Sequence, residues 1–191
     1  ELVSRGHQVI AIARDPARVP HNAEVIVKQD DLSEPKRIAA AIDGADAVIS
    51  AYAPPQDKPE EIVDVTHRQV EAFNYGLKAR LIVVGGAGGL NVAPDVSLID
   101  SGYLPAAYLP IATAHVDALN VLRDSKIDWT YLAPAADFSP GERTGRFRLG
   151  RDELIADAQQ QSRISMEDYA VALVDELETP KHRRQRFSVG Y

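Results

Sequence analysis

Cysteine is absent from the 191-residue chain, and methionine and tryptophan occur only once each. Without thiols the chain has no disulfide, no iron–sulfur cluster, no zinc–thiolate site and no thiol nucleophile. Basic residues are also in the minority, 21 against 28 acidic ones, so the formal charge is -7. Phosphate backbones require a cationic surface, so we expect no nucleic acid among the partners.

Long hydrophobic runs are missing as well. The longest uncharged apolar stretch, from Leu81 to Pro94, is too short and too rich in glycine to span a bilayer, so we expect no membrane partner. Apolar residues make up 45% of the chain and charged residues 26%, a balance typical of a soluble globular protein. The length and the even composition predict one cytoplasmic domain over residues 1–191.

Short β-branched runs alternate with amphipathic stretches along most of the chain. The predicted strands cover residues 7–13, 24–28, 46–51, 81–84 and 128–132, and the predicted helices cover 33–43, 59–76 and 111–125. This alternation predicts an α/β fold with a doubly wound, mostly parallel sheet. Residues 146–156 have the pattern of a hairpin, residues 165–178 that of a capped helix, and residues 187–191 that of a last strand. We expect residues from about 135 to 191 to form a small substrate-side portion.

The chain opens on what resembles the tail of a helix, closed by Gly6. The only methionine is Met166, and a natural chain needs a starting methionine. We therefore expect the natural protein to contain residues upstream of Glu1.

Ligands of doubly wound sheets bind beyond the carboxyl ends of the strands, so the residues there are the first candidates. The first predicted strand ends at Arg14 and Asp15, where an arginine suits the 2′-phosphate of NADP and an acid suits the ribose of NAD. Alternatively, Arg14 is a solvated residue at a strand end. After the second strand, Asp31 is placed to accept a hydrogen bond from an adenine amino group, with Leu32 near the ring. Alternatively, Asp31 supports the helix that Ser33 is predicted to cap.

Two further strand ends are candidates. Ala51 and Tyr52 follow the third strand, where small residues let a cofactor approach the backbone, or where the chain makes a simple turn. Gly85 and Gly86 open a glycine-rich segment after the fourth strand. Such a density of glycine indicates that something approaches the backbone closely, although the spacing is not that of a dinucleotide fingerprint.

The order of these segments resembles the atypical short-chain dehydrogenase/reductases that have NmrA-like, NAD(P)H-binding Rossmann domains. The resemblance is carried by residues 4–16, 81–88, 121–134 and 164–170. Its nearest members are bacterial proteins provisionally named NADH-flavin reductases, and biliverdin reductase B is more distant. The resemblance implies NADP or NAD as cofactor, with NADP favoured, and it implies that Pro134 borders the nicotinamide.

Members of this family begin with a strand and a Gly-x-x-Gly-x-x-Gly turn that binds pyrophosphate at a helix N-terminus. Both features are missing from this sequence. The resemblance implies that the missing strand belongs between the predicted strands at 7–13 and 46–51.

Typical dehydrogenases of the superfamily use a Tyr-x-x-x-Lys pair to deliver a proton to a carbonyl. No tyrosine of this chain has a lysine four residues on. An alcohol or ketone substrate would lack its acid, whereas a flavin or quinone accepts hydride and takes the proton from solvent. His115 matches the position at which proteins like biliverdin reductase B place a histidine near substrate. We interpret it as proton donor or orienter, or alternatively as a partly exposed helix residue.

The sequence therefore predicts an NAD(P)H-dependent oxidoreductase that transfers hydride to a flavin, a quinone or a similar conjugated acceptor, with no metal. The alternative is a non-catalytic, NADP-sensing regulatory protein of the NmrA type. An epimerase or dehydratase is a third possibility, against which the missing tyrosine–lysine pair argues.

Overall fold

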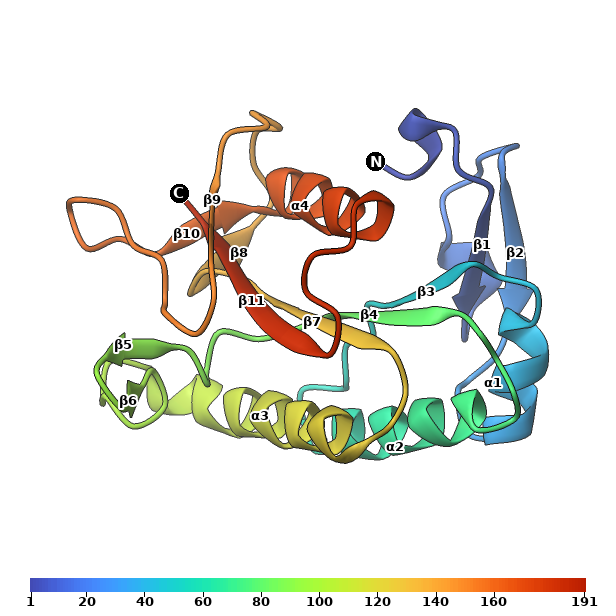
Figure 1. Cartoon of the computed structure of the whole chain (residues 1–191), viewed down its shortest axis with the longest axis horizontal. Helices are drawn as coiled ribbons and strands as arrows, with labels where there is room; N and C mark the ends of the chain where they lie inside the picture. Colours follow the sequence, from blue (N-terminus) through green and yellow to red (C-terminus); the bar gives the residue numbers. More distant parts are fainter.

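Residues 1–191 form a three-layered arrangement in the computed structural model, with a parallel sheet between two layers of helices (Figure 1). The main sheet has the order β3-β4-β7-β11-β9. Its strands are β3 (Ala47–Ser50), β4 (Arg80–Val84), β7 (Trp129–Ala133), β11 (Gln185–Gly190) and β9 (Arg148–Gly150). All neighbours are parallel except β9, which pairs antiparallel with β11. The predicted mostly parallel sheet is thus confirmed.

A second parallel pair stands apart from the main sheet. β1 (Val9–Ala13) pairs with β2 (Val25–Gln29), and β1 is not hydrogen-bonded to β3. This break in the ladder lies between the two strands where the upstream strand is predicted. That strand falls outside the chain described, so it stays a prediction.

Helices cover both faces of the main sheet because its strands are apolar on both sides. α1 (Pro35–Ile42), α2 (Glu61–Phe73) and α3 (Leu109–Asp124) lie on one face, and α4 (Met166–Glu178) lies on the other (Figure 1). Alternate residues of β4 serve the two cores: Leu81 and Val83 pack toward α1–α3, whereas Ile82 packs toward α4. None of the helices combines the length and the apolar character needed to cross a membrane.

Several short elements complete the chain. They are the 3-10 turns η1 (Val3–Arg5), η2 (Pro16–Arg18) and η3 (Ala106–Tyr108), and the short strands β5 (Asn91–Ala93), β6 (Val96–Ser97), β8 (Asp137–Ser139) and β10 (Arg163–Ser165). The predicted stop at Gly6 is confirmed, since this residue ends η1 with φ of 81°. The helix tail before it is a single 3-10 turn.

Two local predictions are wrong. Residues 146–156 do not form a hairpin: β9 pairs with β11, and Glu153 bridges to Asn91 instead. β9 pairs over three residues with the edge of β11, from Ser188 to Gly190. Ser33 does not cap α1 either, because the helix begins at Pro35 with Glu34 as N-cap, and Pro35 is well suited to a first helical position.

Candidate functional site

The residues predicted from the strand ends form two groups at the carboxyl edge of the sheets. The first group follows β1, β2 and β3, and comprises Arg14, Asp31, Leu32, Ala51 and Tyr52. The second lies after β4 and β7 and on α3, and comprises Gly85, Gly86, Pro134 and His115. Ligands of doubly wound folds bind at this edge.

Leu32 has a left-handed backbone, with φ of 59°, although it carries a branched side chain. That conformation costs a non-glycine residue about 1–2 kcal/mol, so neighbouring groups must hold it. The Leu32 N–H donates to Asp30 Oδ1 at 2.7 Å, and the Leu32 carbonyl accepts from Arg68 Nε at 2.7 Å. Backbone strain that side chains maintain is concentrated at functional sites.

The Asp31 carboxylate makes hydrogen bonds with residues that follow it in the chain. Its Oδ1 accepts from the Ser33 N–H at 3.0 Å and from the Arg37 guanidinium. The hydrogen bonds from Ser33, and then the charge of Arg37, lower the pKa of Asp31. Both contacts lie at the start of α1, because Arg37 belongs to its first turn, and they agree with the alternative role of supporting that helix beside Ser33. Its Oδ2 makes no hydrogen bond within the chain and is free to accept one from a ligand.

Tyr52 packs its ring between α2 and α3, against Ile62 and Ala118. Its hydroxyl oxygen is buried and has no hydrogen-bond partner. Burial and the nearby Glu61 carboxylate raise the pKa of Tyr52, while the cations of Arg14 and Arg68 act to lower it. A buried hydroxyl without a partner is uncommon in folded proteins and indicates a place for a ligand or water.

Arg14 is exposed, and its guanidinium forms no ion pair or hydrogen bond within the chain. The adjacent acid is occupied, because the Asp15 carboxylate accepts from the Ala17 N–H at 3.1 Å and caps η2. Of the two residues at the end of β1, the arginine is therefore the one whose charged group remains available.

The glycines after β4 accommodate side chains of the protein itself. A Cβ at Gly85 would lie 2.2 Å from Tyr131 Cε1, and one at Gly86 would lie 2.9 Å from His115 Cγ. The predicted close approach is thus confirmed, and the approaching groups are Tyr131 of β7 and His115 of α3. Contact between these glycines and a cofactor stays a prediction.

Buried Tyr131 and half-buried His115 form one cluster with the glycine segment, so His115 is a partly exposed residue of α3, as the alternative interpretation expects. The Tyr131 hydroxyl accepts from the Gly86 N–H at 2.8 Å and donates to the His115 carbonyl at 3.2 Å. Burial raises the pKa of Tyr131 to about 12 and lowers the pKa of His115 to about 4. At neutral pH the imidazole is uncharged, so it is not an imidazolium acid, and its role as orienter of a substrate stays a prediction.

Ala51 and Pro134 lie at strand ends as predicted. Ala51 is exposed after β3, and Pro134 is buried after β7. Neither contacts another residue of the two groups through a hydrogen bond. Their contacts with a cofactor remain predictions.

Two residues of the site were missed by sequence reasoning. Arg68 lies on α2, three residues after the buried Val65, so helical spacing places it beside the buried face of the helix. This spacing was the one feature of the sequence that could have indicated a contact of Arg68 with the rest of the protein. Tyr131 occupies an apolar strand, where its hydroxyl was the only sign of a polar contact. Arg68 bonds to Leu32, 36 residues away, and Tyr131 bonds to Gly86, 45 residues away. Local sequence patterns cannot predict contacts over such separations.

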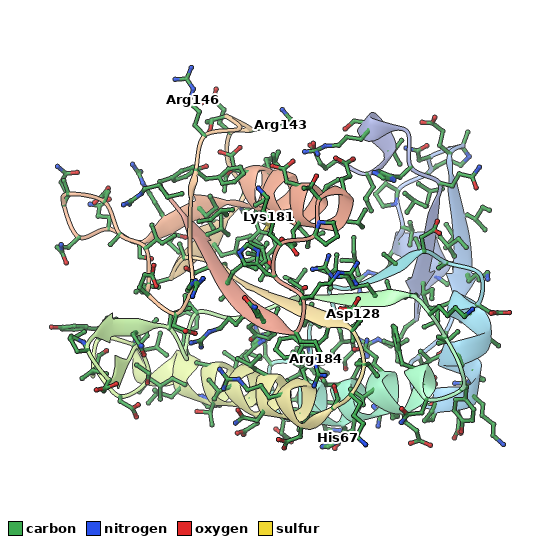
Figure 2. All side chains as sticks on the ribbon, in the orientation of Figure 1. His67, Asp128, Arg143, Arg146, Lys181 and Arg184 are labelled. Atoms are coloured by element: carbon green, nitrogen blue, oxygen red, sulfur yellow. The ribbon has the colours of Figure 1, made fainter.

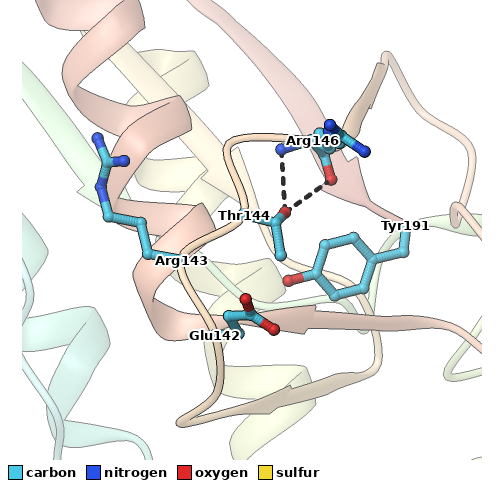
Figure 3. Close-up of a pocket in the computed structure, with 5 residues that line it drawn as sticks. All are labelled: Glu142, Arg143, Thr144, Arg146 and Tyr191. Carbon is cyan, nitrogen blue, oxygen red and sulfur yellow. Dashed lines mark hydrogen bonds between the residues drawn. The ribbon is translucent and has the colours of Figure 1, made fainter.

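Two cavities lie outside these groups. One, of about 570 Å³, is lined by Glu142, Arg143, Thr144, Arg146 and Tyr191 (Figure 3). Arg143 and Arg146 project outward at the side of the sheet opposite His67 and α2 (Figure 2). The other, of about 410 Å³, lies between the first turns of α2 and α3. Neither cavity includes a predicted site residue.

A family model and several solved structures match nearly the whole length of this chain. A family model described as NAD(P)H-binding matches residues 1–180. A protein from Burkholderia pseudomallei, provisionally named an exported protein, is 45% identical with a TM-score of 0.89, over 100% of this chain and 90% of its own. A provisionally named epimerase from Bacteroides thetaiotaomicron is 43% identical with a TM-score of 0.91, over 99% and 88%. A provisionally named NADH-flavin reductase from Streptococcus pneumoniae is 34% identical with a TM-score of 0.85, over 98% and 89%.

Proposed function

The chain belongs to the NAD(P)H-binding family, and we propose that it is an oxidoreductase that passes hydride from NADPH to a flavin, a quinone or a similar conjugated acceptor. The atypical short-chain dehydrogenase/reductases are the group that its structural relatives represent. The acceptor and the preference for NADPH are inferred from the site.

The residues present suit an adenine nucleotide at the first group. Asp31 offers a free carboxylate oxygen, Tyr52 offers a buried hydroxyl without a partner, and Arg14 offers an unpaired guanidinium. These groups match an amino group, a ribose or phosphate oxygen, and a phosphate charge. A reduced nicotinamide, when bound, supplies hydride to an electron-poor acceptor.

The class of hydride acceptor is inferred from the second group of residues. The inference depends on one observation, the burial and hydrogen bonding of Tyr131. The tyrosine hydrogen-bonded to His115 is Tyr131, which is 1% exposed, with its hydroxyl bonded on both sides and its pKa raised to about 12. It is not placed to give a proton to a carbonyl substrate. Conjugated acceptors need no such donor, because the reduced ring takes its proton from water.

The test is NADPH oxidation by the full-length protein with free FMN, with a quinone and with simple ketones and aldehydes. We expect turnover with FMN or the quinone and none with the carbonyl compounds, measured as loss of absorbance of the reduced nicotinamide. Turnover with ketones alone, or with no acceptor of the panel, would contradict the proposal. FMN reduced by NADPH without protein gives the background rate.

The second candidate is a non-catalytic sensor that binds NADP and regulates another protein. The uncharged His115 and the bonded Tyr131 favour it, since neither supplies an acid. This candidate expects measurable NADP binding, no turnover with any acceptor and a stable partner in pull-down. The name of the Bacteroides relative also raises an epimerase, but this chain lacks the tyrosine–lysine pair.

Replacing Arg14 with alanine is expected to weaken NADPH binding by about tenfold or more, because a charged hydrogen bond to phosphate contributes about 1.5–3 kcal/mol. NADH lacks the 2′-phosphate, so its affinity should change less than twofold. Calorimetric titration of both cofactors against the wild type and the variant measures the difference. Arg18→Ala is the matched control, since Arg18 is also exposed and unpaired in the neighbouring turn. Equal losses for NADPH and NADH would remove Arg14 from 2′-phosphate recognition.

A further inference from the structure

Arg68 connects α2 to the turn after β2. Its Nε donates to the Leu32 carbonyl at 2.7 Å, across 36 residues of sequence. Its two Nη atoms make no hydrogen bond, and the side chain has no carboxylate partner. The other arginine at this turn differs, since Arg37 is paired with both Asp30 and Asp31.

The contact acts on the most strained residue of the site. The left-handed backbone of Leu32 is held at its N–H by Asp30 and at its carbonyl by Arg68. If either hydrogen bond is lost, the branched residue gains by relaxing to an ordinary conformation. Relaxation would turn the adjacent Asp31 carboxylate, which is the acceptor available to a ligand.

The positive charge of Arg68 also influences Tyr52. Its charge, together with that of Arg14, acts on the Tyr52 hydroxyl. Arg68 thus contacts one of the strand ends that carry the first group, through Leu32, and its charge acts on another, at Tyr52. No residue of α2 other than Arg68 bonds to the turn after β2.

We propose that Arg68 is a positioning residue for adenine recognition: it fixes the left-handed Leu32 so that Asp31 Oδ2 is directed at the adenine amino group. This inference rests on the proposed function, because it requires a nicotinamide cofactor at the first group. Arg68 acts through Leu32 and Asp31, and it does not take part in hydride transfer.

The test compares two halves of the cofactor on the full-length protein. ADP-ribose carries the adenine, whereas nicotinamide mononucleotide carries a phosphate but no adenine. Arg68→Gln is expected to weaken ADP-ribose by about tenfold or more while changing nicotinamide mononucleotide less than twofold. Arg68→Lys, which keeps a charged donor, should recover part of the loss. His67→Ala is the matched control, because the neighbouring His67 is exposed on the outer side of α2 (Figure 2).

A second pair of variants tests the strain itself. Glycine adopts a left-handed backbone without penalty, so Leu32→Gly removes the need for the Arg68 contact. In that background Arg68→Gln should weaken ADP-ribose less than threefold. An equal loss in both backgrounds, an equal loss for the two ligands, or no loss at all would overturn the inference. Absence of turnover with intact ADP-ribose binding would instead contradict only the reductase proposal.

Discussion

Gly85→Ala is expected to destabilise the protein by about 3 kcal/mol, at the upper end of the usual cost of overpacking. The new Cβ would lie 2.2 Å from Cε1, 2.5 Å from Cζ and 2.7 Å from Cδ1 of Tyr131. The ring cannot move aside, because it is 1% exposed and its hydroxyl is bonded to Gly86 and His115. The change in the free energy of unfolding is measurable by urea denaturation.

The same clash supplies the control for this prediction. Tyr131→Leu removes the ring, so Gly85→Ala should cost much less in that background than in the wild type. Equal costs in the two backgrounds would show that the destabilisation has another cause. A cost below about 1 kcal/mol in the wild type would show that the core relaxes around the methyl group.

The regular elements were predictable because their apolar spacing and their stops agree. β4 and α4 lie within a residue or two of their predicted ends, since an apolar run and a Ser165 cap define them locally. The segment at 146–156 was not predictable, because its turn pattern permitted a hairpin while the edge of β11 offered a better partner. That choice depends on a strand 35 or more residues away.

Some residues of the candidate site were likewise predictable from the sequence, whereas some of its contacts were not. Arg14, Asp31 and Tyr52 were predictable from their place after strands, where the geometry of a doubly wound sheet leaves room for a ligand. Glycine density predicted a close approach at Gly85 but not the approaching group, which is a tyrosine from β7. The Arg68 contact with Leu32 depends on the packing of α2, for which no local pattern exists.

Glu176→Ala is expected to cost about 3–5 kcal/mol, because it leaves the buried Arg80 without its partner. Arg80 and Glu176 are 6% and 4% exposed, and they form an ion pair at the opposite end of the main sheet from the candidate site. Glu176 also accepts from the His182 N–H at 3.0 Å and from its ring at 2.8 Å. Urea denaturation at neutral pH measures the loss. Asp128→Ala, which removes the half-exposed partner of the exposed Arg183, is the surface control and should change stability little.

The pH dependence and a double replacement separate the charge from the packing. Burial acts to raise the pKa of Glu176, but hydrogen bonds from Arg80 and His182 outweigh it, and the pKa is lowered. A carboxylate with a lowered pKa in the folded state stabilises the protein above its unfolded pKa, and that stabilisation is lost as the pH falls below about 4.5. The difference between wild type and Glu176→Ala should therefore shrink in acid. Arg80→Met combined with Glu176→Leu should restore part of the stability, since it removes the unpaired buried charge but leaves the His182 N–H without its acceptor. If the double variant were as unstable as Glu176→Ala, the lost hydrogen bonds to Glu176 or the packing around β4 and α4, and not the unpaired charge, would be responsible.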